Sequence, residues 1–277
     1  MGLTVNNNIA AMNAYRNLSV TNSSLSKSLE KLSSGFRINR AADDAAGLSI
    51  SERLRSQVGG LKMAVRNAQD GVSVIQTAEG ALNEVHSLLQ RMRDLAVQAS
   101  NSGAQDSASQ TAAATEVQQA VNEIDRIAGA TKYGSAALLD ASVTGGFSFL
   151  VGADGASVNL INFSISSVSA ASLTLSSISS SVASGLTSAI SQIDAAISYV
   201  SSVRSSLGAY QNRFEHTIAN LGVTVENLSA SESRIRDTDM AQEMVSFTRS
   251  QILMQAGTAM LGQANQAPQS VLSLLRG

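Results

Sequence analysis

Apolar residues recur at alternating four- and three-residue steps along residues 186–228, and eleven of the thirteen positions are apolar. A heptad pattern sustained over about six repeats is typical of a long helix that packs side by side with another helix. Such a helix would extend roughly 65 Å. The positions are Leu186, Ile190, Ile193, Ile197, Val200, Arg204, Leu207, Gln211, Phe214, Ile218, Leu221, Val225 and Leu228.

A second seam of apolar positions predicts another long helix, with one irregularity in the heptads. The three-residue step between Ile75 and Ala78 indicates a stammer, a local overwinding of the helix. Residues 100–107 are typical of a turn, and Ala112 to Ala128 predict a third helix. The second seam consists of Leu61, Val65, Ala68, Val72 and Ile75, followed by Ala78, Leu82, Val85, Leu89, Met92, Ala96 and Ala99.

Between these helices the pattern changes to alternation. Phe147, Phe149 and Val151 occupy alternate positions, and Val158, Leu160 and Phe163 follow the dipeptide Asp154-Gly155. Because Asp-Gly suits a turn with positive φ, this stretch predicts a β-hairpin. Residues 164–184 are serine-rich and predict only a linker or weak strands.

The two ends of the chain are amphipathic, but neither has a partner nearby in the sequence. Residues 3–36 and 240–275 each predict a one-sided helix, and Asp239 with Gln242 suits the start of the second one. An isolated helix of this kind is marginal in water, so both must bury their apolar sides elsewhere. Their polar sides hold too few Lys and Arg for a membrane surface. The ends therefore favour packing between copies and head-to-tail polymerisation.

Composition supports long helices and weighs against several kinds of function. The chain is 44% hydrophobic but only 4% aromatic, with one proline, no cysteine and a net charge of −2. No basic block predicts nucleic-acid binding, and no apolar run is long enough to span a membrane. The start of the chain lacks the features of a secretory signal, so an exported form is expected to leave without a cleaved signal peptide.

Candidate chemistry is sparse. The two histidines, His86 and His216, have no ligand-spaced carboxylates around them, and no HExxH motif occurs. The acid pairs at Asp43-Asp44 and at Asp237 with Asp239 are explained by helix capping or interface pairing. We therefore expect no enzyme, no metal and no cofactor.

Several blocks of the chain, in order, resemble bacterial flagellin. They are LEKLSSGFRINRAADDAAGLSISERL (29–54), LQRMRDLAVQAS (89–100), NEIDRIAGATKYG (122–134), SSLGAYQNRFEHTIANL, SRIRDTDMAQEM and QAGTAMLGQANQAPQSVLSLLR. The matching blocks span nearly the whole chain except roughly residues 140–185. They are very specific together, and they identify the chain as a member of this family.

The resemblance implies a mainly α-helical fold with long coiled-coil-like helices in an elongated rod, a small β-hairpin, and two discontinuous domains built from both halves of the chain. The outer variable domains of many flagellins are expected to be missing, because only a short serine-rich stretch follows the hairpin. The expected divisions are an inner domain from 1–36 and 235–277, a connector at 37–47, and an outer rod from 48–175 and 176–234.

The resemblance also implies interface residues. In the inner domain, the apolar sides of the terminal helices are expected to contact other copies. A second set in the connector offers opposite charges that could pair between copies, although a solvated elbow with ordinary surface charges is the alternative. The first set is Leu18, Leu25, Leu29, Leu32, Met244, Phe247, Leu253, Met260, Leu272 and Leu275, and the second is Arg37, Arg40, Asp43 and Asp44.

A third set matches the surface that the flagellin-sensing Toll-like receptor contacts in many flagellins. Helical spacing predicts that residues 91, 95 and 98 share one face. Asp94 stands where the family usually has Glu, which leaves the affinity open. The primary role expected of this surface is packing between subunits. The set is Gln90, Arg91, Leu95, Gln98 and Glu116.

The function implied is that of a structural subunit of the extracellular bacterial flagellar filament, used for swimming. The expected partners are other copies of the chain, an export chaperone, the filament cap, hook-junction proteins and, in a host, the Toll-like receptor. One alternative is a hook–filament junction protein of the same superfamily. The other is an adhesin or hydrolase on a coiled-coil stalk, which would need a larger head than residues 140–185 provide.

Overall fold

The computed structural model describes residues 7–101, 106–140, 146–184 and 187–276, with side chains as far as residue 266. The chain forms two compact units, one from residues 1–56 and 227–277 and the other from residues 57–226. We call them the terminal unit and the central unit. The mainly helical fold built from both halves of the chain is confirmed. The assignment of inner domain, connector and rod stays a prediction.

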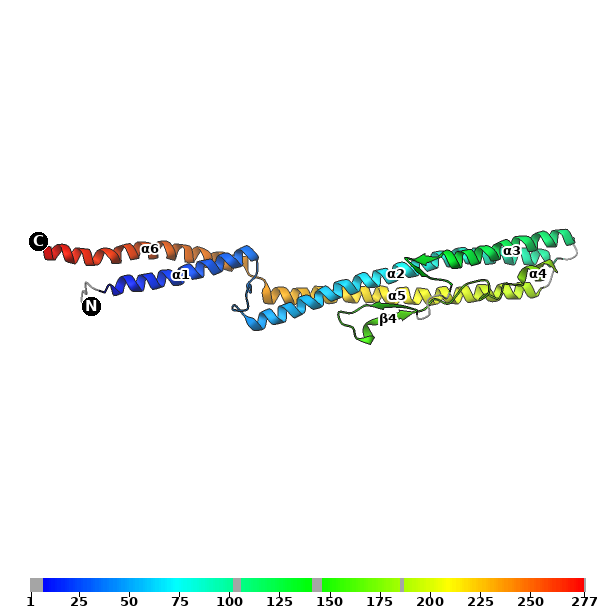
Figure 1. Ribbon diagram of the computed structural model, residues 1–277, viewed down its shortest axis with the longest axis horizontal. Helices are drawn as coiled ribbons and strands as arrows, with labels where there is room; N and C mark the ends of the chain where they lie inside the picture. The colour runs from blue at the N-terminus through cyan, green and yellow to red at the C-terminus, as the bar shows by residue number, and fades with distance from the viewer. Residues whose placement is uncertain (1–6, 102–105, 141–145, 185–186, 277) are drawn as a thin grey trace. The chain divides into compact units, whose positions relative to one another are not determined.

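The terminal unit contains two antiparallel helices, α1 (Ile9–Ser34) and α6 (Met240–Arg276), which lie side by side in Figure 1. Both begin at side-chain caps. The Asn8 Oδ1 accepts a hydrogen bond from the Ala11 amide at 3.0 Å, and the Asp239 Oδ1 accepts one from the Gln242 amide at 3.1 Å. The predicted helix start at Asp239 is therefore confirmed. Gly35 ends α1 with a positive φ of 76°, which glycine adopts without steric cost.

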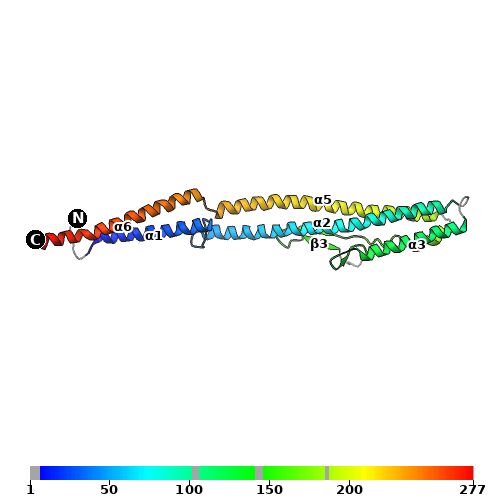
Figure 2. The same ribbon diagram turned by 90° about the horizontal axis from the view of Figure 1, so that it is seen from above.

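The central unit is organised around α2 (Ala45–Ala99) and α5 (Ser188–Arg236), whose outermost turns at 45–56 and 227–236 belong to the terminal unit. The two helices run antiparallel (Figure 2). The Arg93 Nε lies 2.7 Å from the Asp194 Oδ1, and the Arg204 guanidinium lies 3.5 Å from the Glu79 carboxylate. Exposed pairs of this kind contribute only about 0–1 kcal/mol each. Buried apolar residues therefore hold these helices together.

Along α2 the seam predicted from the sequence is right in its second half, and in its first half it is wrong only at Val65 and Val72. The buried positions from Leu61 onward alternate in three- and four-residue steps without interruption, because Ala64 and Gly71 are buried whereas Val65 and Val72 are only half-buried. The predicted stammer after Ile75 is therefore wrong. The continuous seam is Leu61, Ala64, Ala68, Gly71, Ile75, Ala78, Leu82, Val85, Leu89, Met92, Ala96 and Ala99.

On α5 the heptad pattern is confirmed at every second position from Ile193 to Leu221; Leu228 is half-buried, and Leu186 lies outside the described residues. Ile193, Val200, Leu207, Phe214 and Leu221 are buried, but the alternate predicted positions, such as Ile190 and Ile197, are half-buried. Three smaller residues, each three or four positions from one of these buried residues, complete the buried stripe of α5 in place of the half-buried ones. A helix that is covered by more than one element buries a wider stripe than a two-stranded coiled coil does. These three residues are Ala189, Ala196 and Val203.

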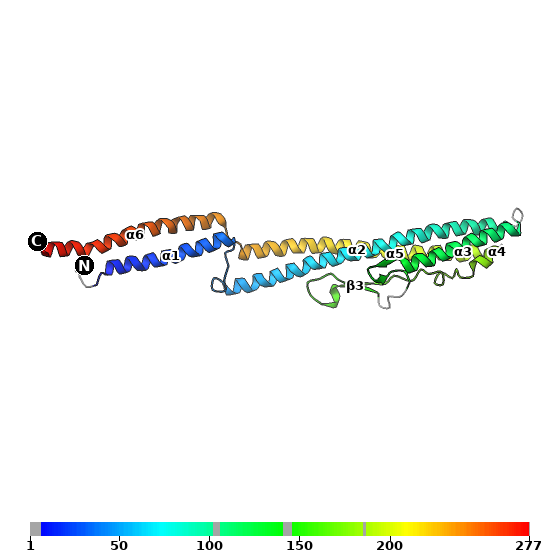
Figure 3. The same cartoon turned by 45° about the horizontal axis from the view of Figure 1, so that its top comes forward.

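The serine-rich stretch is packed structure rather than a linker. Helix α3 (Ser107–Ala130) begins at the Asp106 cap and lies beside the short α4 (Ile178–Ala183), as Figure 3 shows. Before α4 the chain is fixed by a hydrogen bond from the Ala170 amide to the Asp125 Oδ1 at 2.7 Å. Between the serines lie apolar residues that are all buried: Val168, Ala170, Leu173, Leu175, Ile178 and Val182.

The predicted hairpin is present, but its turn differs. Strands β3 (Phe147–Leu150) and β4 (Leu160–Phe163) are antiparallel, with Phe147 opposite Phe163. Their connection contains the 3-10 turn η1 (Ser157–Asn159), and Gly155 does not have a positive φ. The prediction of a tight turn at Asp154-Gly155 is therefore wrong, because the connection between Leu150 and Leu160 is long enough to reverse the chain without one. A second antiparallel pair, β1 (Lys132–Tyr133) with β2 (Ala136–Ala137), was not predicted; Gly134 between them has a φ of 62°.

An aromatic cluster attaches the hairpin to the helices. The Phe149 ring meets Phe214 of α5 edge to face, with centroids 5.7 Å apart, and Phe163 lies 5.4 Å from Tyr210. Phe214 is fully buried, and its ring fills the space left by Gly71 of α2, where a Cβ would lie 2.8 Å from the Phe214 Cζ. The hairpin, α2 and α5 thus depend on the absence of a side chain at Gly71.

Two matched glycine substitutions test this packing. Gly71→Ala should lower the free energy of unfolding by about 1 kcal/mol, because overpacking costs about 1–3 kcal/mol and the gain in helix propensity offsets about 1. Gly80→Ala on the same helix meets no atom within 4 Å and should instead stabilise by about 0.5–1 kcal/mol. Urea unfolding followed by circular dichroism measures both, and equal stabilisation by the two variants would contradict the packing described.

Candidate subunit interface

The terminal unit has almost no apolar core of its own. Among its described side chains, Ile38 is the one fully buried apolar residue, whereas the central unit buries apolar residues along every helix. Large apolar side chains of the terminal unit are instead exposed, up to 66% at Tyr15 and 64% at Met260. Those on α1 and α6 are Ile9, Met12, Tyr15, Val20, Leu29, Met240, Met244, Val245, Ile252, Leu253 and Met260.

Helices α1 and α6 cover each other on one side only. A Cβ on Gly257 would lie 3.1 Å from the Leu18 Cδ1, so the helices approach closely there. Near one end the Asn8 Nδ2 donates to the Ala264 carbonyl at 2.7 Å, and near the other the Lys31 Nζ lies 3.8 Å from the Glu243 carboxylate. Two helices in contact leave most of each surface uncovered.

The predicted inner-domain residues therefore divide into two groups. Leu18, Leu25, Leu32 and Phe247 are half-buried, whereas the remaining described members are about half exposed or more. The side chains of Leu272 and Leu275 lie outside the described residues. The exposed members are Leu29, Met244, Leu253 and Met260.

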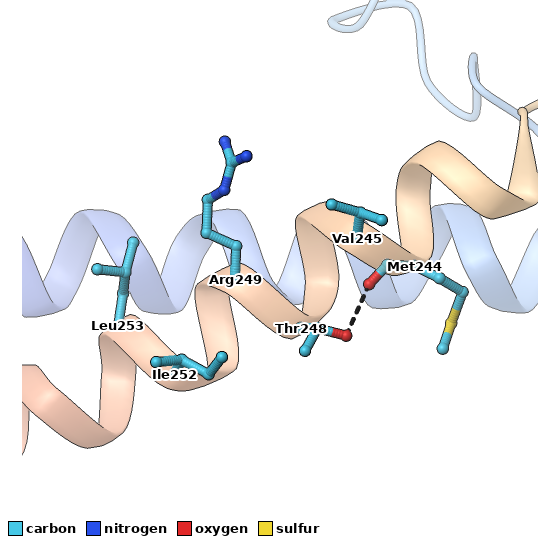
Figure 4. Close-up of a pocket in the computed structure, with 6 residues that line it drawn as sticks. All are labelled: Met244, Val245, Thr248, Arg249, Ile252 and Leu253. Atoms are coloured by element: carbon cyan, nitrogen blue, oxygen red, sulfur yellow. Dashed lines mark hydrogen bonds between the residues drawn. The ribbon is translucent and has the colours of Figure 1, made fainter.

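An open apolar groove runs along α6. Its lining forms two neighbouring rows at four-residue spacing, which Figure 4 shows on adjacent sides of the helix. The Thr248 hydroxyl donates to the Met244 carbonyl at 2.8 Å, so its hydrogen-bond donor is already satisfied within α6. The rows are Met244, Thr248 and Ile252, and Val245, Arg249 and Leu253. A second groove along α1 and α6 is lined by Ala11, Met12, Tyr15, Arg16, Ser19, Leu261 and Asn265.

The connector is tied to the segment between α5 and α6 by the backbone. Phe36 and Asp237 form an isolated antiparallel bridge, in which the Arg37 amide donates to the Arg236 carbonyl at 2.6 Å. The Arg37 guanidinium also donates to the Ile235 carbonyl at 2.5 Å. Ile38, 1% exposed, packs against Gly47 of α2, where a Cβ would lie 2.8 Å from the Ile38 Cδ1. The connector is therefore an ordered part of the terminal unit.

The other charged connector residues also have partners within the chain. The Arg40 Nε lies 2.8 Å from the Glu30 carboxylate, and the Asp44 Oδ1 accepts a hydrogen bond from the Gly47 amide at 2.8 Å at the start of α2. Asp43 accepts hydrogen bonds from the Arg40 and Asn39 amides, and these bonds lower the pKa of its carboxyl group. These contacts match the alternative of a local elbow. Pairing between copies stays a prediction.

Arg236 is a residue that the sequence analysis missed. Its guanidinium lies 2.6 Å from the Glu52 Oε1 and 4.8 Å from the centre of the Phe36 ring. It therefore joins the end of α5 to the first turns of α2 and to the connector. Basic residues are favoured in the last turn of a helix, and this preference was the signal available at Arg234 and Arg236.

The predicted receptor surface is only partly formed as expected. The Arg91 guanidinium pairs with the Glu116 carboxylate at 2.7 Å, and both side chains are exposed. Gln98 is also exposed, and the Gln90 Nε2 lies 3.0 Å from the His86 Nε2. Leu95, however, is only 4% exposed. It does not share the open face of residues 91 and 98, because it is buried next to the seam residue Ala96 of α2.

The described residues contain no group of three or more His, Asp or Glu side chains placed to hold a metal ion. No helix in this part of the chain is both long and apolar enough to cross a membrane. His216 is exposed on α5. What the geometry defines is a mainly α-helical protein whose terminal helices expose apolar side chains.

The chain belongs to the bacterial flagellin family. The model of the bacterial flagellin N-terminal helical region matches residues 5–144, and that of the C-terminal helical region matches residues 190–275. A flagellin of Halalkalibacterium halodurans is 52% identical over 99% of this chain and all of its own length, and one of Bacillus subtilis is 45% identical with the same coverage.

Further similarities agree with this assignment. The flagellar filament 33 kDa core protein of Treponema phagedenis is 45% identical over 99% of this chain and the whole of its own. Among solved structures, the crystal structure of Bacillus cereus flagellin has a TM-score of 0.50 and 29% identity. It covers 56% of this chain and 88% of its own.

The Asp43 hydrogen bonds give a prediction about pH. Its lowered pKa means that the carboxylate stabilises the connector above about pH 4, the ordinary range of aspartate, and that this contribution disappears as the pH falls through the lower folded value. In the free chain, the amide resonances of Asn39 and Arg40 should titrate with a midpoint below the ordinary pKa of an aspartate carboxyl group. Asp43→Asn should abolish this titration, and a midpoint at or above the ordinary value would contradict the geometry.

Proposed function

We propose that this chain is a structural subunit that polymerises into a bacterial flagellar filament, in which α1 and α6 pack against the same helices of neighbouring copies. The observation that carries the proposal is the near absence of a core in the terminal unit, where apolar side chains face outward on both helices. The names of its relatives, flagellin and flagellar filament core protein, support it.

Neighbouring copies would supply the burial that the terminal unit lacks. Fully burying a Val, Leu, Ile or Met side chain contributes about 1.5–3 kcal/mol, and many such side chains here are about half exposed or more. Because helices without tertiary packing are only marginally stable, their folding and the assembly of the filament would be coupled. A contact between two different faces gives an open helical polymer when the rotation between copies does not close a ring.

The outer surface of the central unit would take part in the same polymer. Gln90, Arg91, Gln98 and Glu116 lie at the surface of α2 and α3, and we propose that they contact adjacent subunits in the filament. The same exposed residues would form the contact with the Toll-like receptor when the chain is free in a host. Leu95 would support this surface from beneath, since it is buried.

The remaining proposed partners follow from the exposed terminal helices. An export chaperone would cover the grooves on α1 and α6 before assembly, and the filament cap and hook-junction proteins would contact them at the two ends of the polymer. The alternative of a displayed adhesin or hydrolase is disfavoured, because residues 146–184 pack onto α3 and α5 and do not form a separate head.

A pair of matched charge substitutions on α6 tests the proposed function. Leu253→Asp should abolish polymerisation, since Leu253 is 52% exposed in the free chain and its burial between copies would strand a carboxylate. Gln251→Asp, an exposed polar position two residues away, adds the same charge and should leave polymerisation intact. Sedimentation and electron microscopy of seeded assembly measure both variants. The packing argument fails if the Leu253→Asp chain forms normal filaments.

A further inference from the structure

The methionines of this chain are unevenly placed. Met12, Met240, Met244 and Met260 are 48–64% exposed on α1 and α6 of the terminal unit. In the central unit, Met92 is fully buried in the seam of α2. Met63 is exposed there, but it lies outside both apolar grooves of the terminal unit. The free chain therefore presents thioether sulfur mainly on the surface that we assign to polymerisation.

Two of these residues line the grooves directly. Met244 belongs to the groove along α6, where Figure 4 shows its side chain beside Val245 and Thr248, and Met12 lines the groove shared by α1 and α6. The chain contains no cysteine, so methionine is its only sulfur. An oxidant that reacts with sulfur therefore has no thiol to attack first and reaches the exposed thioethers.

We propose that the exposed methionines of α1 and α6 are an oxidation site that controls assembly, and this proposal rests on the proposed function. A hydroperoxide transfers one oxygen atom to the thioether sulfur, which loses two electrons and becomes a sulfoxide. The O–O bond breaks, and the other oxygen leaves as water or an alcohol. The sulfoxide is polar and chiral, whereas the thioether was apolar and flexible.

The consequence follows from what the grooves must do. Burying a sulfoxide between copies without a hydrogen-bond partner makes the free energy of assembly less favourable. The favourable free energy of burying the apolar thioether is lost as well. Assembly in turn removes these methionines from solvent, so a finished filament resists the oxidant that disables a free subunit. A methionine sulfoxide reductase supplied with a dithiol as the electron donor returns the sulfoxide to the thioether, releases the oxygen as water and leaves the donor as a disulfide. The oxidation is therefore a reversible block rather than damage alone.

The test uses the full-length monomer, hydrogen peroxide and seeded polymerisation. Mass spectrometry should show that Met12, Met240, Met244 and Met260 oxidise in the free chain well before Met92. The critical concentration for polymerisation should then rise by about tenfold or more, because one buried apolar side chain is worth a factor of this order. Treatment with sulfoxide reductases should restore the original value.

Substitution separates these methionines from other effects of peroxide. A variant with Met12→Leu, Met240→Leu, Met244→Leu and Met260→Leu conserves volume and should polymerise equally well before and after treatment. Met63→Leu is the matched control, and its polymerisation should stay peroxide-sensitive. Unchanged polymerisation of the oxidised natural chain, equal loss in the fourfold variant, or no recovery with the reductases would each overturn the proposal. If the untreated chain does not polymerise at all, it is the proposed function that fails.

Discussion

The terminal unit depends on one constraint: two helices in contact can cover only one side of each other. Helices α1 and α6 meet through Leu18 and Gly257 and are fixed at their ends by polar contacts, yet Ile38 is the one fully buried apolar residue among the described side chains of this unit. The exposed apolar rows of both helices are therefore a feature of the sequence that no rearrangement of the pair removes. Further protein must cover them.

The central unit meets the opposite condition, since α3, α4 and the hairpin close around α2 and α5. Its closest packing uses small residues rather than large ones. Gly71 admits the Phe214 ring, and Gly60 lies against the hairpin loop at Ala153. The central unit therefore buries its apolar core with its own elements. The Arg91–Glu116 pair lies on its surface, where we propose that it contacts other copies.

The sequence predicted the helices well, because a periodic pattern over many turns depends on few local details. The sequence-based prediction failed where small residues determine which side of a helix is buried. Val65 and Val72 were preferred over Ala64 and Gly71 as seam positions, since a hydrophobic pattern weighs side-chain size and cannot foresee the ring of Phe214 entering from another helix. In the serine-rich stretch, Val168 and Leu175 are buried although polar residues surround them in the sequence. Only tertiary packing selects these positions.

The interface residues show the same division between local and tertiary causes. Amphipathic spacing found Leu29, Leu253 and Met260, whose exposure needs no knowledge of the partner helix. It could not separate them from Leu18 and Phe247, because the side of α1 that meets α6 depends on contacts between distant segments, such as Leu18 with Gly257 and Asn8 with the Ala264 carbonyl. Spacing along one helix cannot reveal burial by another, which is why Leu95 was expected at the surface. A stripe that exceeds what its own chain can cover is therefore the feature that points to assembly.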